Sequence, residues 1–258
     1  MNSSGKELLC AIVGDLPCAA AREALVSIAP IAPIAPIATI ATILITGTNR
    51  GIGLELVRHY AARGDSVIAV CRHSSSELEK TGARVITDVD VSDDQSVQRL
   101  IAACENNSID VLLLNAGLLT KETLDNLDFD RMRRQYEVNS LGPLRVIKAL
   151  LENLAKGAKV VIVTSRVGSL EDNGSGGNYG YRMSKTAVNM AGVNLALDLK
   201  PRGIAVLLVH PGLVATNMTG RKGIAPAEAA EGIVARIDEL SLADTGTFRH
   251  ANGDTLPW

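Results

Sequence analysis

Residues 40–53, Ile40-Ala41-Thr42-Ile43-Leu44-Ile45-Thr46-Gly47-Thr48-Asn49-Arg50-Gly51-Ile52-Gly53, join an apolar, β-branched run to three glycines. The run favours a strand, and a helix-like segment, Leu54–Ala62, follows the glycines. Strand, glycine turn and helix in this order are the context of a dinucleotide-binding turn. Gly47 would allow a tight turn, Gly51 would admit a pyrophosphate at the helix N-terminus, and Gly53 would let helix and strand pack closely. Because an ordinary glycine-rich turn has the same features, further motifs must decide.

A second pattern places Tyr181 four residues before Lys185, which puts both side chains on one face of a helix. A nearby ammonium favours the phenolate, so we expect Lys185 to lower the pKa of Tyr181 towards the range useful for acid–base catalysis. Tyr179 is the competing candidate, but it is followed at the same spacing by the uncharged Met183. Taken alone, the Tyr–Lys pair is equally typical of a solvated helix face.

Further short motifs accompany these two patterns. In chain order the six elements are T-G-x-x-x-G-x-G at Thr46–Gly53, N-A-G at Asn115–Gly117, V-N-x-x-G at Val138–Gly142, S-x-x-G at Ser165–Gly168, Y-x-x-x-K at Tyr181–Lys185 and P-G-x-x-x-T at Pro211–Thr216. With this order and spacing, most of residues 40–258 resembles the short-chain dehydrogenase/reductase family. The Arg182–Lys185 stretch and the ending Gly253–Trp258 look most similar to its C-factor-like carbonyl reductase branch.

The resemblance implies a catalytic set of Asn139, Ser165, Tyr181 and Lys185. Ser165 follows the apolar run Val160–Thr164, so we expect it at the carboxyl end of a strand, where open α/β sheets bind ligands and its hydroxyl can orient a carbonyl oxygen. By resemblance, Tyr181 exchanges a proton with that oxygen, Lys185 also binds the nicotinamide ribose, and Asn139 holds a proton-relaying water. The alternatives are a buried, satisfied helix amide for Asn139 and a strand-end cap for Ser165.

Cofactor choice depends on the residues after the second expected strand. An NAD-specific site carries an acid there that binds the ribose 2′-hydroxyl, whereas this chain reads Cys71-Arg72-His73. Arg72 and Arg50 have forked donors suited to a 2′-phosphate, so we expect NADP(H), although both could be ordinary surface residues. The other cofactor contacts implied by the motifs and the resemblance are Gly47, Thr48, Asn49, Gly51, Ile52, Gly53, Asp90, Val91, Asn115, Ala116, Gly117, Tyr181, Lys185, Pro211, Gly212, Val214 and Thr216.

The composition fits one large α/β domain. The 258 residues are 47% hydrophobic with a formal net charge of -2, and the dispersed lysines and arginines argue against a nucleic-acid partner. The four cysteines form no C-x-x-C pair and have no metal-ligand spacing with the four histidines. We therefore expect no metal site, and free thiols in a reducing cytoplasm.

Hydrophobic patterning predicts alternating elements. Strands are expected near 40–46, 67–71, 84–88, 109–115, 159–164, 204–209 and 246–249, and helices near 51–63, 93–105, 127–154, 180–200 and 226–239. This alternation predicts a single domain over residues 39–258, a doubly wound, Rossmann-type α/β fold with a parallel sheet of about seven strands and helices on both faces. The resemblance implies association through the long helices into a homo-dimer or homo-tetramer.

Residues 1–38 form an extension of unknown role. Uncharged residues run from Ala24 to Thr48, which is long enough for a membrane span. However, Pro30, Pro33 and Pro36 of an Ile-Ala-Pro repeat prevent a regular helix, and the last third of the run is the first expected strand. We expect no membrane partner. The repeat suits an extended segment that packs on the surface, mediates association or has no function.

Three functions remain open from the sequence. The first is NADPH-dependent reduction of a ketone or aldehyde, which the intact catalytic set favours. The second is a dinucleotide-binding signalling or interaction protein, and the third a 3-oxoacyl thioester reductase. The glycine-rich segment Arg166–Gly180 could border the substrate, and the cover Leu213–Ile224 is short, which suits a permissive site. Val214, Met218 and Arg221 are candidate substrate contacts.

Overall fold

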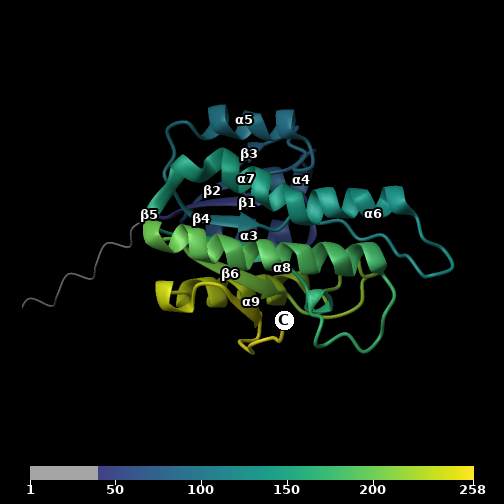
Figure 1. Cartoon of the computed structure of the whole chain (residues 1–258). Helices are drawn as coiled ribbons and strands as arrows, with labels where there is room; N and C mark the ends of the chain where they lie inside the picture. The colour runs from purple at the N-terminus through teal and green to yellow at the C-terminus, as the bar shows by residue number, and fades with distance from the viewer. Residues whose placement is uncertain (1–39) are drawn as a thin grey trace, which may run out of the picture. The chain divides into compact units, whose positions relative to one another are not determined.

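The computed structural model describes residues 40–258. The predictions for residues 1–38 lie outside the described residues. Seven strands form one sheet in the order β3-β2-β1-β4-β5-β6-β7 (Figure 1), and every neighbouring pair is parallel. The strands are β1 (Thr42–Thr46), β2 (Ser66–Val70), β3 (Arg84–Ile86), β4 (Ile109–Leu114), β5 (Leu154–Val163), β6 (Ala205–His210) and β7 (Thr247–His250).

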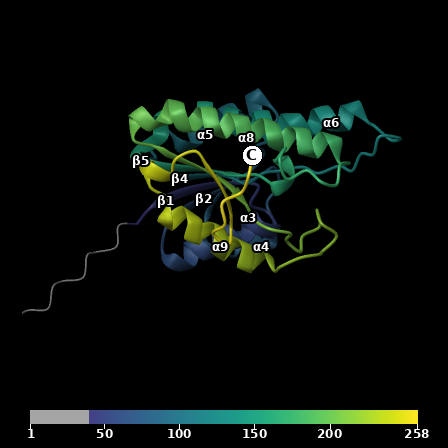
Figure 2. The same ribbon diagram turned by 60° about the horizontal axis from the view of Figure 1, so that its bottom comes forward.

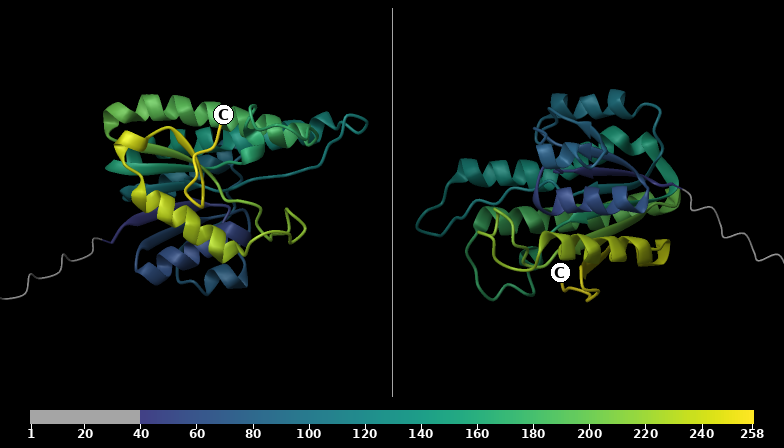
Figure 3. Two further views of the ribbon diagram at one scale, coloured as in Figure 1. Left: turned by 90° about the horizontal axis from the view of Figure 1, so that it is seen from below. Right: turned by 180° about the vertical axis from the view of Figure 1, so that it is seen from behind.

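Helices cover both faces of this sheet. They are α3 (Gly51–Arg63), α4 (Ser76–Glu79), α5 (Asp94–Cys104), α6 (Phe129–Tyr136), α7 (Gly142–Leu150), α8 (Tyr179–Leu199) and α9 (Pro226–Glu239). Figure 2 shows α3 and α9 on one side and α5 and α8 on the other. Figure 3 shows the same layers from below and from behind. The predicted doubly wound fold is confirmed.

The strand sequences explain why both faces are covered. Side chains alternate between the two faces of a strand, and in β1 both sets are apolar. Ile43 and Ile45 belong to the core that includes residues of α3 and α9, whereas Leu44 belongs to the core that includes residues of α5, α7 and α8. All three are fully buried. A sheet apolar on both sides needs two helical layers to exclude water.

One expected helix differs from the structure. The segment predicted as a single helix over 127–154 consists of α6, a π-helical stretch Glu137–Leu141, and α7, and β5 already begins at Leu154. Pro143 at the start of α7 lacks a backbone donor, which suits a break in the helical hydrogen bonding. A Cβ on Gly142 would lie 2.9 Å from Val91 Cγ2, so the backbone packs closely here. The break places Asn139 in the π-helical stretch.

The carboxyl ends of the parallel strands meet at one edge of the sheet. The glycine turn follows β1, Arg72 follows β2, Asn115 follows β4 and Ser165 follows β5. Ligands of open α/β sheets bind at this edge. The candidate residues, which are scattered over the sequence, are therefore gathered at one side of the molecule.

Candidate active site

The three glycine positions of the turn leave little or no space for a Cβ. Gly47 and Gly51 have φ values of 73° and 59°, which favour glycine. A Cβ on Gly47 would lie 2.8 Å from Ala116 Cα, and a Cβ on Gly53 would lie 2.2 Å from the Gly47 carbonyl oxygen. Arg50, the N-cap of α3, makes no side-chain capping bond. The first amides of α3 are therefore open to an anion, as a pyrophosphate site requires.

Asn115 joins the turn to β4. Its Nδ2 donates to the carbonyl oxygens of Thr46, at 3.0 Å, and Gly47, at 3.1 Å. The Thr46 hydroxyl in turn accepts from the backbone amides of Asn115 and Ala116 at 3.1 and 3.2 Å. The Asn115 side chain thus steadies the turn, and its contact with a cofactor stays a prediction.

The P-G-x-x-x-T element approaches the turn from the opposite end of the chain. A Cβ on Gly51 would lie 3.3 Å from Thr216 Cγ2, so the two segments are in close contact. The loop carrying Thr216 is closed by pairing of Val214 with Ile224. Thr219 reinforces it by donating to the Val214 carbonyl at 2.5 Å. The structure therefore brings Thr216 to the predicted cofactor turn.

The end of β2 contributes a cation and no acid. Val70 O accepts from the Gly47 amide at 2.8 Å and from the Thr48 hydroxyl at 3.2 Å, so β2 ends beside the turn. Two residues on, the exposed Arg72 lies 3.5 Å from Asp90. Burial raises the pKa of the Asp90 carboxyl, but hydrogen bonds from Ser92 and the charge of Arg72 outweigh it, so the net pKa is lowered.

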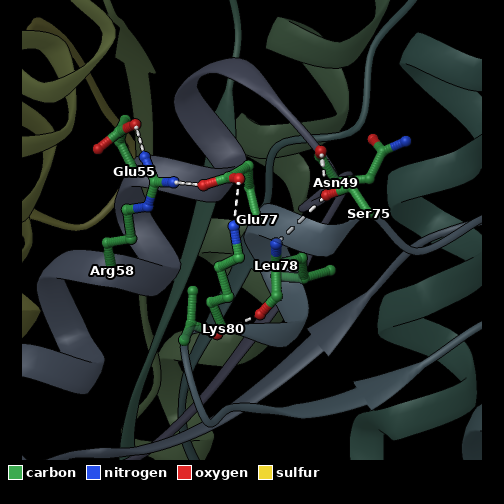
Figure 4. Close-up of polar contacts among 8 residues, drawn as sticks. Asn49, Glu55, Arg58, Ser75, Glu77, Leu78 and Lys80 are labelled. Atoms are coloured by element: carbon green, nitrogen blue, oxygen red, sulfur yellow. Dashed lines mark hydrogen bonds and ion pairs between the residues drawn. The ribbon is translucent and has the colours of Figure 1, made fainter.

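A short helix absent from the sequence prediction supports the turn (Figure 4). The Ser75 hydroxyl caps α4 by accepting from the Leu78 amide at 3.3 Å, and it donates to the Asn49 carbonyl at 2.9 Å. The serine run before Glu77 is a helix-start signal that could have indicated this element.

The same close-up shows which nearby cations are already paired. Arg58 contacts Glu55 at 2.7 Å and Glu77 at 3.0 Å, and Lys80 contacts Glu77 at 2.9 Å. Within residues 40–258, by contrast, no ion pair includes Arg50. Arg50 thus carries an unpaired charge beside the turn, which suits an anionic ligand.

Tyr181 and Lys185 meet Ser165 on the sheet side of α8. Lys185 is 4% exposed, and its Nζ donates to Val163 O at 2.9 Å and lies 5.8 Å from the centre of the Tyr181 ring. Burial lowers the pKa of Lys185 to about 8. Burial also raises the pKa of Tyr181 to about 12, against the opposing effect of a hydrogen bond from Ser165. The predicted lowering of the Tyr181 pKa is therefore wrong for this structure, because burial outweighs any effect of Lys185.

Ser165 lies two residues beyond β5, as its apolar run predicted. It is buried, and its hydroxyl accepts from the Val167 amide at 3.4 Å, so it caps the short 3₁₀ turn Arg166–Gly168. The hydroxyl also interacts with Tyr181. Both the capping alternative and the proximity to Tyr181 are thus found in the structure.

Asn139 is a buried amide with its bonds satisfied. Its Nδ2 donates to Leu118 O at 2.8 Å and to Ser184 Oγ at 2.9 Å, and its Oδ1 accepts from the Leu118 amide at 2.8 Å. Ser184, which was not predicted as a site residue, also donates to Tyr181 O at 2.8 Å. It therefore links Asn139 to helix α8. The water-relay role of Asn139 stays a prediction.

A groove of about 610 Å³ lies along the outward side of α8. Tyr179, Met183 and Met190 line it, together with part of the glycine-rich connection that precedes the helix. Tyr181 and Lys185 are not among its lining residues. The Tyr181 ring, whose centre is 5.8 Å from Lys185 Nζ, is the one that lies beside the lysine. The role of the connection beside the substrate stays a prediction.

The remaining features of residues 40–258 concern metal ligands, cysteines and membrane spans. No cluster of potential metal ligands occurs in that range. Cys71 and Cys104 are buried free thiols there. None of the helices in this part of the chain is long and apolar enough to span a membrane.

Comparisons with known proteins agree with this arrangement. A family model described as short chain dehydrogenase matches residues 41–226. The 1-hydroxy-2-glutathionyl-2-methyl-3-butene dehydrogenase of Rhodococcus sp. (strain AD45) is 43% identical over 223 residues, covering 84% of this chain and 99% of that protein. The C-signal protein of Myxococcus xanthus is 43% identical over 154 residues, covering 58% of this chain and 93% of that protein.

Solved structures are also similar. An NADPH-bound carbonyl reductase from chicken fatty liver has a TM-score of 0.78 at 26% identity, covering 85% of this chain and 99% of its own. The carbonyl reductase Sniffer of D. melanogaster has a TM-score of 0.77 at 26% identity, covering 85% of this chain and 100% of its own.

Proposed function

This chain belongs to the short-chain dehydrogenase family, and from that premise we propose that it is an NADP(H)-dependent oxidoreductase that reduces a ketone or aldehyde to an alcohol. The family supports the oxidoreductase class. One observation supports carbonyl reduction in particular: Ser165, Tyr181 and Lys185 meet at the carboxyl edge of the sheet. The turn that can hold a dinucleotide lies at the same edge.

The residues present fit a phosphorylated dinucleotide. The closely packed glycines of the turn and the uncapped start of α3 suit a pyrophosphate. Arg50 suits a 2′-phosphate, and the exposed Arg72 would have to exchange its ion pair with Asp90 for that phosphate. No acid occupies the stretch Cys71–His73, where an NAD-specific site carries one. The NADPH bound in the similar chicken carbonyl reductase supports the same choice. When bound, NADPH supplies the hydride.

The chain's own residues supply orientation and the proton. Ser165 would donate a hydrogen bond to the substrate carbonyl oxygen and hold it beside Tyr181. Tyr181 would then donate its proton to that oxygen as negative charge develops there. Because burial raises the pKa of Tyr181 to about 12, the phenol keeps its proton at neutral pH. This is the protonation state that carbonyl reduction requires, and in the reverse direction the phenolate would take the alcohol's proton.

Lys185 would return a proton to Tyr181 between turnovers. With a pKa of about 8, its ammonium is a stronger acid than an ordinary lysine and is still charged at neutral pH. Asn139 would hold the water that connects Lys185 to solvent, as proposed from the resemblance. The bond from Lys185 Nζ to Val163 O fixes the ammonium near the Tyr181 ring.

A signalling protein on the same fold is the second candidate. The 43% identity with C-signal supports it. The complete set of Asn139, Ser165, Tyr181 and Lys185 favours catalysis instead, because a pure binding protein has no need of a buried lysine beside a half-buried tyrosine. A 3-oxoacyl thioester reductase shares the chemistry, and the Rhodococcus relative adds thioether-substituted alcohols to the substrates worth testing.

We also propose self-association into a homo-dimer or homo-tetramer through α8. Met183, Met190 and Leu197 recur every seven residues on this helix, and all three are exposed. Such a stripe of apolar side chains is typical of a protein–protein interface.

The test follows absorbance at 340 nm with NADPH or NADH and a panel of ketones, aldehydes, quinones and 3-oxoacyl thioesters, and with NADP+ or NAD+ and glutathione-conjugated alcohols. Turnover that prefers NADPH and is lost in Tyr181→Phe is the expected result. NADPH binding without turnover of any substrate would instead favour the signalling candidate. Equal KM values for NADH and NADPH would contradict the 2′-phosphate assignment.

A further inference from the structure

A buried polar cluster outside the catalytic set lies between the connection after β4 and helix α6. Its members are Thr120, Glu122 and Gln135. Glu122 is 1% exposed and Gln135 is completely buried. No ion pair within residues 40–258 includes Glu122. A carboxyl group is thus held in the interior without a cationic partner.

The cluster satisfies itself by hydrogen bonds. The Thr120 hydroxyl donates to Glu122 Oε1 at 2.5 Å, and Gln135 Nε2 donates to both Glu122 oxygens at 3.2–3.3 Å. Gln135 Oε1 accepts from the Thr120 amide at 3.0 Å. Each side chain therefore has one orientation that satisfies its neighbours, and such a network holds its backbone segments in one relative position.

This cluster also contacts the beginning of α8. Glu122 O accepts from the Asn178 amide at 2.8 Å. A Cβ on Gly180 would lie 2.4 Å from Gln135 Nε2, so the first turn of α8 rests directly on the glutamine. Tyr181 is the next residue along the chain.

The first turn of α8 is not held by a cap of its own. Asn178 has a φ of 48°, a left-handed conformation that is uncommon for residues other than glycine, and its side chain makes no capping bond. Two contacts hold this turn instead: the backbone carbonyl of Glu122 accepts from the Asn178 amide, and the Gln135 side chain packs against Gly180. Movement of either would displace the turn that carries Tyr181.

Stability alone does not account for the carboxyl group. Replacing a buried polar group by well-packed apolar side chains of similar volume is often neutral or stabilising. A hydrogen-bonded carboxyl group instead fixes the relative orientation of the segments that bond to it, which an apolar cluster cannot do.

We propose that Glu122 and Gln135 are positioning residues that set the first turn of α8 and thereby place the Tyr181 hydroxyl beside Ser165. The proposal rests on the proposed function, because its main readout is turnover. Neither residue touches the reacting atoms in this assignment. A displacement of about 1 Å at a reacting group can cost up to about 100-fold in rate. A change at the buried contact between Gln135 and the first turn of α8 should therefore be measurable in kcat.

The experiment exchanges the two groups. Gln135→Glu places two carboxyl groups together in the cluster, and Glu122→Gln leaves the cluster with no carboxyl group. The double exchange restores one carboxyl and one amide group with their places swapped. Asp130→Asn is the matched control, because Asp130 lies on the same helix α6 but its side chain is exposed. Full-length protein is assayed for kcat, KM, NADPH dissociation constant and thermal midpoint. Hydrogen exchange of residues 179–184 reports the first turn of α8 without any substrate.

We expect Gln135→Glu to lower kcat by about 10-fold or more with an NADPH affinity close to that of the wild type, and the double exchange to recover most of that loss. Glu122→Gln should be milder and remain folded. Hydrogen exchange at residues 179–184 should rise in each variant in which kcat falls, and Asp130→Asn should change nothing.

Two results would overturn the proposal. One is an unchanged kcat in the folded single variants, with only the thermal midpoint lowered. The other is a loss of kcat and NADPH affinity in equal proportion that the double exchange does not repair. If the wild type turns over no substrate, the proposed function fails instead, and hydrogen exchange still decides whether the cluster holds α8.

Discussion

The glycine turn and the trio of Ser165, Tyr181 and Lys185 are built on opposite principles. In the turn, the backbone passes so close to its surroundings that a Cβ on Gly53 would lie 2.2 Å from the Gly47 carbonyl oxygen. In the trio, side chains are enclosed by the surrounding elements, and burial lowers the pKa of Lys185 and raises that of Tyr181. Close contacts of single glycines shape the turn, whereas the environment of the trio depends on water exclusion by several elements together. The two regions should therefore respond differently to mutation and to pH.

Removal of the Tyr181 hydroxyl is expected to have the largest effect and to separate the two regions. Tyr181→Phe should lower kcat by about 100- to 10,000-fold, the contribution of a positioned acid. NADPH affinity should fall much less than kcat, because the turn is untouched and Tyr181 is only one of the predicted cofactor contacts. Steady-state kinetics and NADPH fluorescence titration measure both quantities. Retained turnover would show that the trio is not the proton source.

Gly53→Ala should have the reverse signature. Its Cβ would lie 2.2 Å from Gly47 O, so the turn must shift, at a cost of about 1–3 kcal/mol. We expect NADPH affinity to fall by about 10-fold or more, together with a lower thermal midpoint. Gly174→Ala is the control, because nothing lies within 4 Å of a Cβ there. Equal effects of the two substitutions would contradict the close-packing explanation.

A change of pH should affect the trio and spare the turn. The pKa of Lys185 is lowered to about 8, so its ammonium is present below pH 8 and lost above it. If that ammonium returns the proton, kcat for reduction should be level below pH 8 and fall by about 10-fold for each further pH unit. A profile of kcat with saturating NADPH tests this, and a level profile up to pH 10 would contradict it.

Arg50→Ala should have the smallest effect and sharpen the description of the turn. The loss of one charge-assisted contact, about 1 kcal/mol when solvated, should reduce the preference for NADPH over NADH by about fivefold. Arg58→Ala is the matched control, because Arg58 is already paired with Glu55 and Glu77. The ratio of kcat/KM for the two cofactors is the measurement. An equal loss in the control would indicate a general charge effect.

The same contrast explains which features were predictable. The order of strands and helices follows from local hydrophobic runs, and α3 and α9 have the bounds expected from the sequence. The break at Glu137–Leu141 was not predicted, although Pro143 is a local signal for it, and the close packing of Gly142 against Val91 is visible only in the fold. Ser75 was missed because its role needs the Asn49 carbonyl 26 positions away in the sequence.

Residue chemistry and spacing by themselves determined the fold class, the glycine turn and the pairing of Tyr181 with Lys185, because each depends on neighbours within a few positions along the chain. Tertiary structure alone decided the direction of the Tyr181 pKa shift, the satisfied amide of Asn139 and the buried contact of Gln135 with the start of α8. Burial and desolvation arise only when distant segments exclude water together, so no local pattern encodes them.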